Sequence, residues 1–218
     1  MKRTFYLSIL FMPSLLWAQD EKQTLPLDLF YEGKVALQNG DTIKGLIKYS
    51  LDDLLQVWHN HQTESFSAQK VSFFEIFDQS DQRVRQFYAV RYAGNGQYKT
   101  PVFFELISKG RLTVLSREKI HVITSRGPGF HQPTSETVIV NKYFLADQDG
   151  TITDFDGKKN KWYELMGNHA NEIREYVKNN KLDFDKKYQL KNIIDHFNSL
   201  PNQSIFSSAK TSDFSIQR

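Results

Sequence analysis

The sequence predicts a mainly β protein of the α+β class: an antiparallel β-sandwich or partly open barrel followed by two or three C-terminal α-helices. Three observations lead to this prediction. Strand-like runs are separated by turn residues at intervals of roughly 8–12 residues. Seventeen Phe and ten Tyr favour strands and supply a core. After Gly157 the apolar residues recur with the period of a helix.

Residues 1–18 are expected to be a cleavable export signal. Lys2 and Arg3 precede an uncharged apolar run of 13 residues, Phe5–Trp17. Such a run is typical of a secretory signal peptide and falls short of the roughly 20 residues that cross a bilayer. Cleavage is expected between Ala18 and Gln19, which leaves a soluble mature chain with no transmembrane segment.

The composition excludes several kinds of site and partner. The chain has no cysteine, which excludes disulfides, thiolate metal ligands, a cysteine nucleophile and a lipid-modified cysteine. An exported chain of this size without disulfides fits a bacterial envelope. Removal of the signal takes Lys2 and Arg3 from 28 basic residues and leaves 26 against 25 acidic ones, a net charge of +1. A nucleic-acid partner, which would need a concentrated basic face, is therefore not expected.

A β-rich domain is expected over residues 19–156, and its most distinct element is a β-hairpin over 29–50. Apolar residues alternate along its first strand, and Asn39-Gly40-Asp41 is a tight-turn signal. Two further runs, Val71–Phe77 and Val102–Ile107, are apolar on both faces, which is typical of central strands. The complete set of further strands predicted is Leu55–His59, Val71–Phe77, Val84–Tyr92, Thr100–Ser108, Arg111–Leu115, Ile120–Thr124 and Thr137–Ala146.

The C-terminal segment, residues 157–200, is expected to form amphipathic helices that pack on the sheet. Gly167-Asn168 is predicted to end one helix and cap the next, and Asp183 or Asp185 to cap the last. Residues 201–218 are expected to be a flexible tail that starts with a helix-stopping Pro201. The apolar residues at helical spacing are Trp162, Leu165, Met166, Ile173, Tyr176, Val177, Leu190, Ile193, Ile194 and Phe197.

One stretch resembles a catalytic motif. Phe144–Thr151 is similar to the Asp-x-Asp-Gly-Thr signature of haloacid-dehalogenase-type phosphatases, in which Asp147 would be the nucleophile and Asp149 the acid. That chemistry needs the first strand of a parallel α/β domain, with a lysine and further acids later in the chain. Only 67 residues follow Thr151, and the preceding strands suit an antiparallel sheet. A hairpin turn at Asp149-Gly150 explains the same residues.

The same acidic stretch is a candidate calcium site. Asp147, Asp149, Asp154 and Asp156 supply the carboxylate oxygens that Ca²⁺ prefers. The spacing departs from an EF-hand loop, which needs Gly at its sixth position and Glu at its twelfth, and solvated turn acids are the alternative. No other cofactor is expected.

Two more candidate sites involve histidine. His59 and His61 would lie on one face of a continuing strand, as two zinc ligands would, although the spacing identifies no third ligand. Residues 125–135 are the longest stretch without a strand or helix period. There Arg126, Phe130 and His131 form a candidate recognition tip, with a plain surface loop as the alternative.

The order of these features is similar to that of short exported proteins of the Bacteroidota. The resembling parts are the signal ending Trp17-Ala18-Gln19, the hairpin segment Gly33–Gly45 and the ending Tyr176–Leu200. The resemblance implies a periplasmic or outer-membrane-associated location. It carries no known activity, so no functional residue is transferred. The chain shows no recognisable type IX sorting domain, which favours the periplasm over full secretion.

These observations lead to three functional hypotheses. The first is an exported envelope protein that acts as a non-enzymatic binding or structural module and binds a protein or an envelope ligand. The second is a hydrolase that acts on envelope or imported material, with a site assembled from residues distant in sequence. It would not be a serine hydrolase of the Gly-x-Ser-x-Gly type, because the chain lacks that motif. The third is a calcium-stabilised structural domain.

Overall fold

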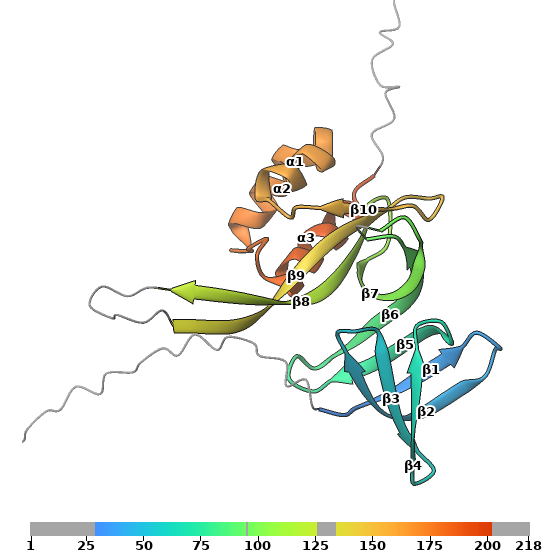
Figure 1. Cartoon of the computed structure of the whole chain (residues 1–218). Coiled ribbons are helices and arrows are strands. Elements are labelled where there is room, and N and C mark those ends of the chain that lie inside the picture. Colours follow the sequence, from blue (N-terminus) through green and yellow to red (C-terminus); the bar gives the residue numbers. More distant parts are fainter. Residues whose placement is uncertain (1–28, 95, 126–133, 202–218) are drawn as a thin grey trace, which may run out of the picture.

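The computed structural model describes residues 29–94, 96–125 and 134–201 (Figure 1). Within them, ten strands form one antiparallel sheet in the order β10-β9-β8-β7-β6-β5-β1-β2-β3-β4, which is not closed. The prediction of a mainly β fold is confirmed, with one open sheet in place of the two sheets of a sandwich. The strands are β1 Tyr31–Leu37, β2 Thr42–Ser50, β3 Leu54–His59, β4 Gln62–Ser67, β5 Val71–Asp78, β6 Arg83–Tyr92, β7 Thr100–Ser108, β8 Thr113–Ser125, β9 Thr134–Ala146 and β10 Ile152–Phe155.

Strands β1–β5 form a strongly curled half of the sheet. Strands β4 and β5 are separated by three strands in the sheet order, yet only residues 68–70 connect them. Four strand spacings of a flat sheet amount to about 19 Å, whereas the chain from Ser67 to Val71 spans at most about 14 Å. The sheet must therefore bend back on itself. Its concave side encloses a core that includes Val35, Ile47 and Phe74.

Two glycines allow this curvature. Gly33 of β1 and Gly45 of β2 are directly paired. A Cβ atom at Gly33 would lie 2.2 Å from the Glu75 carbonyl oxygen, and one at Gly45 would lie 2.4 Å from the Trp58 carbonyl oxygen. Neighbouring backbones approach these positions too closely for any side chain, so only glycine fits both.

Strands β7–β10 and the helices form the second half. Successive residues of a strand point to opposite faces, and here each face has its own core. On one face, Val114 and Tyr143 pack with the helices around Trp162. On the other, Phe104 packs with Leu115 and Phe144. The sequence runs that are apolar on both faces are therefore central strands, as predicted: β5 and β7 each lie between two neighbours.

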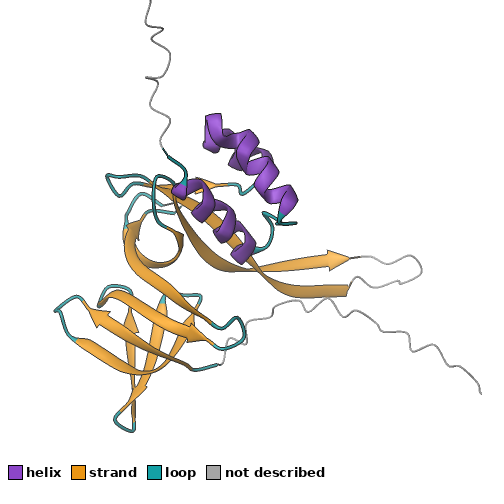
Figure 2. Ribbon diagram, turned by 180° about the vertical axis from the view of Figure 1, so that it is seen from behind, coloured by secondary structure: helices purple, strands orange, loops and turns teal. Residues whose placement is uncertain are grey.

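The helices cover one face of the second half (Figure 2). Helix α1 (Lys159–Met166) continues through a 3₁₀ turn at Gly167–His169 into α2 (Ala170–Asn179), and α3 spans Lys187–Ser199. The helical C-terminal segment is confirmed, and so are its apolar faces except at Leu165, which is exposed. Gly167, at a φ of 54°, ends α1 as predicted, but the two predictions for the helix starts are wrong. The residue before α2 is His169 and the residue before α3 is Lys186, and neither makes a side-chain capping bond. No helix in the described part of the chain is long and apolar enough for a membrane span.

The two halves are also tied together by Asp53, in the turn between β2 and β3. Strand β7 pairs with β8 only from Glu105 onward. At Phe103 the backbone N–H instead donates to Asp53 Oδ1 at 2.7 Å, while Asp53 Oδ2 lies 2.8 Å from Arg117 Nη2. A buried N–H without a partner would be unfavourable. Asp53 therefore supplies the acceptor that the diverging β8 does not.

The predicted hairpin over 29–50 is confirmed as β1 and β2, with Gly40 at a φ of +95° in its turn. Two details of the strands differ from the prediction. Strand β4 was not predicted, because only Phe66 of its residues is buried. The predicted runs 111–115, from Thr113 on, and 120–124 belong to the single strand β8, because Arg117, Glu118 and Lys119 interrupt the apolar pattern without ending the strand.

Candidate functional site

Several of the predicted site residues lie outside the described part of the chain. These are the loop residues Arg126, Phe130 and His131 and the cleavage position between Ala18 and Gln19. The expected tail lies outside it too, apart from Pro201, which follows the end of α3.

Of the four candidate calcium ligands, the carboxylates of Asp147, Asp154 and Asp156 each have a partner within the protein. The predicted hairpin is confirmed: β9 and β10 are paired, and Asp147 Oδ1 accepts hydrogen bonds from the backbone N–H groups of Asp149 and Thr151 in the turn. Asp154 and Asp156 point elsewhere. Asp154 pairs with Lys142 and Tyr92, and Asp156 with Lys158. In the described residues, no group of three or more acidic or histidine side chains is placed to hold a metal ion.

His59 and His61 do not form a pair of ligands. Strand β3 ends at His59, and both Asn60 and His61 have positive φ values, of 47° and 62°, in the two-residue turn to β4. The turn separates the two imidazoles, since a shared face would require the strand to continue. His59 Nε2 lies 2.6 Å from Glu64 Oε1.

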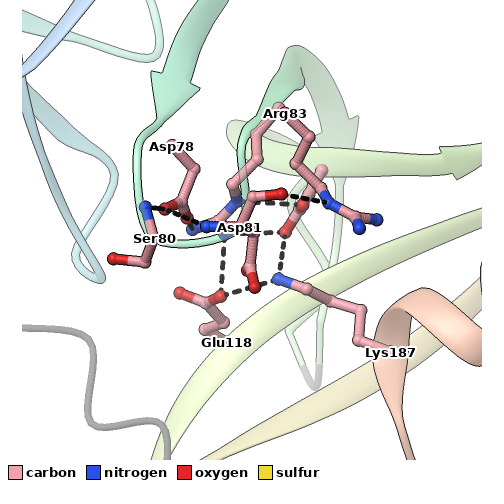
Figure 3. Close-up of polar contacts among 8 residues, drawn as sticks. Asp78, Ser80, Asp81, Arg83, Glu118 and Lys187 are labelled. Carbon is pink, nitrogen blue, oxygen red and sulfur yellow. Dashed lines mark hydrogen bonds and ion pairs between the residues drawn. The ribbon is translucent and has the colours of Figure 1, made fainter.

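Among the residues that the structure describes, the largest group of interacting charges is a buried cluster where β5, β6, β7, β8 and α3 meet (Figure 3). We call it the Arg85 cluster; it consists of Asp78, Arg85, Glu105, Glu118 and Lys187. Arg85 is 3% exposed, and none of the other four side chains is more than 10% exposed. Charged side chains this deeply buried are rare unless they are paired.

The geometry of the Arg85 cluster pairs every charge. The Arg85 guanidinium donates from Nε to Glu105 Oε1 at 3.0 Å and from Nη2 to Glu105 Oε2 at 2.8 Å. The same Nη2 donates to Glu118 Oε1 at 2.7 Å. Lys187 Nζ, from α3, lies 3.0 Å from Glu105 Oε2 and 3.1 Å from Glu118 Oε1. Both cations thus bridge the same two carboxylates.

Asp78 completes the cluster at greater distance. Its Oδ2 lies 3.7 Å from Arg85 Nη1, and its Oδ1 accepts hydrogen bonds from the backbone N–H groups of Ser80 and Asp81. Beside it, the Arg83 guanidinium lies over the Tyr188 ring of α3, 3.8 Å from the ring centroid. The turn between β5 and β6 is therefore joined to the same helix.

The local field keeps Glu105 and Arg85 charged. Burial acts to raise the pKa of Glu105, but the nearby Lys187 and Arg85 more than offset it and lower that pKa to about 2. Burial likewise acts to lower the pKa of Arg85, and its pairing with Glu105 raises that pKa above the usual value. A carboxylate held ionised by two donors has no proton to give and is a poor base. The Arg85 cluster is thus suited to holding strands and helix together.

The sequence carries little signal for this cluster. Its members come from positions 78 to 187, and no spacing rule connects them. The single available hint is that Arg85 and Glu105 interrupt runs that are otherwise strand-like and largely apolar. A charge in such a run is expected to have a buried partner, but the partner's identity depends on which strands are neighbours.

The Glu105 carboxylate is expected to make the stability depend on pH in the acid range. Its pKa is about 2 in the folded state and 4.5 ordinarily. A carboxylate whose pKa is lowered by folding stabilises the protein at pH values above its ordinary pKa. That stabilisation is lost as the pH falls towards the pKa of the folded state. The shift corresponds to about 3 kcal/mol. Urea unfolding of wild type and Glu105→Gln should therefore show a difference that shrinks from pH 5 to pH 2.

The matched control is Glu164→Gln, at an exposed glutamate paired with Lys161. Its difference from wild type should stay small over the whole range, because an exposed ion pair contributes little. A wild-type to Glu105→Gln difference that stays constant between pH 5 and pH 2 would contradict the proposed role of the carboxylate.

A second feature is a two-stranded arm that projects from the sheet in both views (Figures 1 and 2). Strands β8 and β9 pair from Thr113 opposite Ala146 to Ser125 opposite Thr134. Strand β7 pairs with β8 only as far as Ser116, and β10 pairs with β9 only from Tyr143 to Ala146. Residues 117–125 and 134–142, which we call the β8–β9 arm, therefore pair only with each other within the described residues.

The β8–β9 arm exposes large apolar side chains. Ile120, Val122, Ile123 and Val140 are all well exposed, with Val122 at 56%. Ile120 and Val122 lie on one face and Ile123 and Val140 on the other, because successive residues alternate. A lone two-stranded ribbon is at best marginally stable in water, and exposed apolar strands with free edges are prone to pair with another chain.

Comparison with known proteins adds no family to these observations. The chain matches no protein-family model, no curated protein and no solved structure. Its function is therefore inferred from its own residues.

Proposed function

We propose that this chain is an exported protein of the bacterial envelope that acts as a non-enzymatic binding module, with the β8–β9 arm as its partner-binding surface. The observation that carries the proposal is the projection of apolar residues such as Ile120 and Val122 beyond the rest of the sheet. Exposed apolar patches of this kind mark interaction sites. The free edges of the arm also offer N–H and C=O groups, to which a partner strand can add.

The charged residues support binding over catalysis. The carboxylates of the Arg85 cluster are buried and each is paired with a cation, so they serve the fold. The arm contributes Lys119 and His121 on the face that carries Ile123, which gives that face a polar margin around an apolar centre. Such a mixture is typical of interfaces between proteins.

The export part of the proposal comes from residues 1–18. The basic start, the apolar run of 13 residues and the small Ala18 before a polar stretch are the features of a signal peptide. The absence of cysteine is compatible with a periplasmic protein that folds without disulfides.

The test compares two valines that are equally exposed. Val122 of the arm is 56% exposed and Val84 of β6 is 55% exposed. In a Bacteroidota host, the wild-type protein should be recovered from the periplasm or outer-membrane fraction with Gln19 as its first residue. Val122→Lys should lower the amount retained by washed envelopes at least about tenfold, since a lysine in an apolar interface costs more than about 1.4 kcal/mol. Val84→Lys should be retained like wild type.

Two outcomes would overturn the proposal. Equal retention of the Val122 and Val84 variants would remove the arm as the binding surface. A cytoplasmic protein that keeps residues 1–18 would remove the envelope location.

A further inference from the structure

A shallow groove lies in the curled half of the sheet, away from the β8–β9 arm. It is open to solvent and has a volume of about 460 Å³. Gly33 of β1 and Gly45 of β2, which are directly paired, lie at its base. The other lining residues are Glu32, Lys44, Leu46, Trp58, His59 and Asn60.

Trp58 supplies the apolar part of this groove. Its side chain is 43% exposed although it lies in the interior of β3. It stands opposite Leu46, which in turn stands opposite Glu32, so the three residues form one row across the face of the sheet. An indole exposed in such a row is a flat surface on which a ring can stack.

The charges of the groove favour a neutral ligand. Glu32 and Lys44 carry opposite charges, and the His59 imidazole is engaged with Glu64. Because these two formal charges cancel, the groove offers no net attraction to a ligand of either sign. A carboxylate accepts hydrogen bonds, an ammonium donates them, and the Asn60 amide does both. Hydroxyl groups, which donate and accept, match this set of partners.

We propose that the groove binds a neutral oligosaccharide. Trp58 stacks against the apolar face of a sugar ring, and Glu32, Lys44 and Asn60 bond to its hydroxyl groups. This site is separate from the β8–β9 arm and takes a different class of ligand. Either proposal can therefore be wrong while the other is right.

The test is calorimetric titration of the mature protein with neutral tetrasaccharides (cellotetraose, maltotetraose and chitotetraose). At least one should bind with a Kd of about 1 mM or lower. Trp58→Ala should raise that Kd at least about tenfold, because it removes the stacking surface, whereas Trp58→Phe should keep most of the binding. A change in tryptophan fluorescence when the sugar is added would place the site at Trp58, since the other tryptophan of the mature chain, Trp162, is fully buried.

The control is Tyr98→Ala, at an aromatic residue that is 85% exposed and lies outside the groove. It should bind the sugar like wild type, and so should the arm variant Val122→Lys. The proposal is overturned if none of the three sugars binds at concentrations up to about 10 mM, or if Trp58→Ala, folded as judged by its thermal melt, binds them as wild type does. Tighter binding of a charged tetrasaccharide, either tetragalacturonate or chitosan tetramer, would also overturn it.

Discussion

Replacement of Arg85 by methionine is expected to destabilise the protein by about 3–5 kcal/mol, because it leaves buried carboxylates without their principal cation. Glu105 and Glu118 would then share only Lys187, and Asp78 would lose its ion pair altogether. Urea unfolding followed by circular dichroism measures the loss. The control is Arg91→Met on the same strand, at an exposed position, where the change should stay within about 0.5 kcal/mol.

A double variant separates the loss of the ion pair from the loss of packing. In Arg85→Met/Glu105→Met the remaining Glu118 keeps Lys187 as its partner. The second substitution should therefore restore part of the stability, because exchanging both members of a buried pair for apolar groups is far less costly than removing one. If the double variant lost the sum of the two single losses, the two side chains would not be coupled and the ion pair would not be the cause.

Replacement of Trp162 by alanine is expected to cost about 3–5 kcal/mol as well, through a cavity in the core beneath the helices. Trp162 is fully buried, its ring centroid lies 4.3 Å from that of Phe155, and its Nε1 donates to the Gly157 carbonyl at 2.9 Å. The substitution removes two contacts of α1, one with Phe155 of β10 and one with Gly157 in the segment between β10 and α1. For a chain of this size the melting temperature should fall by roughly 10 °C.

The comparison is with Trp58→Ala, the same substitution at an exposed tryptophan. It should change the melting temperature little, since truncation of an exposed side chain leaves no cavity. Near-ultraviolet circular dichroism should lose the Trp162 signal in the first variant and keep it in the second. Similar melting temperatures for the two variants would mean that the helices contribute little to the stability of the fold.

Local patterns predicted local structure well. The hairpin of β1 and β2 follows from alternation and an Asn-Gly turn, and the turn at Asp147–Gly150 follows from the same kind of signal. Both depend on residues close in sequence, whose backbone preferences act before any tertiary contact. The same holds for the helical periodicity around Ile173 and Ile193, which became the buried faces of α2 and α3.

Elements that depend on their neighbours were missed or misjudged. Strand β4 has a polar sequence and is held as an edge strand by its pairing with β3. Helix α3 begins without a side-chain cap, since the packing of its apolar face on the sheet stabilises it in place of a cap. Strand β8 continues through Arg117 and Glu118 because their charges find partners in Asp53 and Arg85.

The sequence by itself determined a mainly β chain with helices at its C-terminal end, and it supports the prediction of an export signal. These depend on the periodicity of apolar residues and on composition, which are properties of neighbouring positions in the chain. Only the tertiary structure decided that Arg85, Glu105, Glu118 and Lys187 meet, that the sheet curls at Gly33 and Gly45, and that an apolar arm projects from it. Such features arise from strand order and curvature, which bring distant residues into contact and leave no local pattern in the sequence.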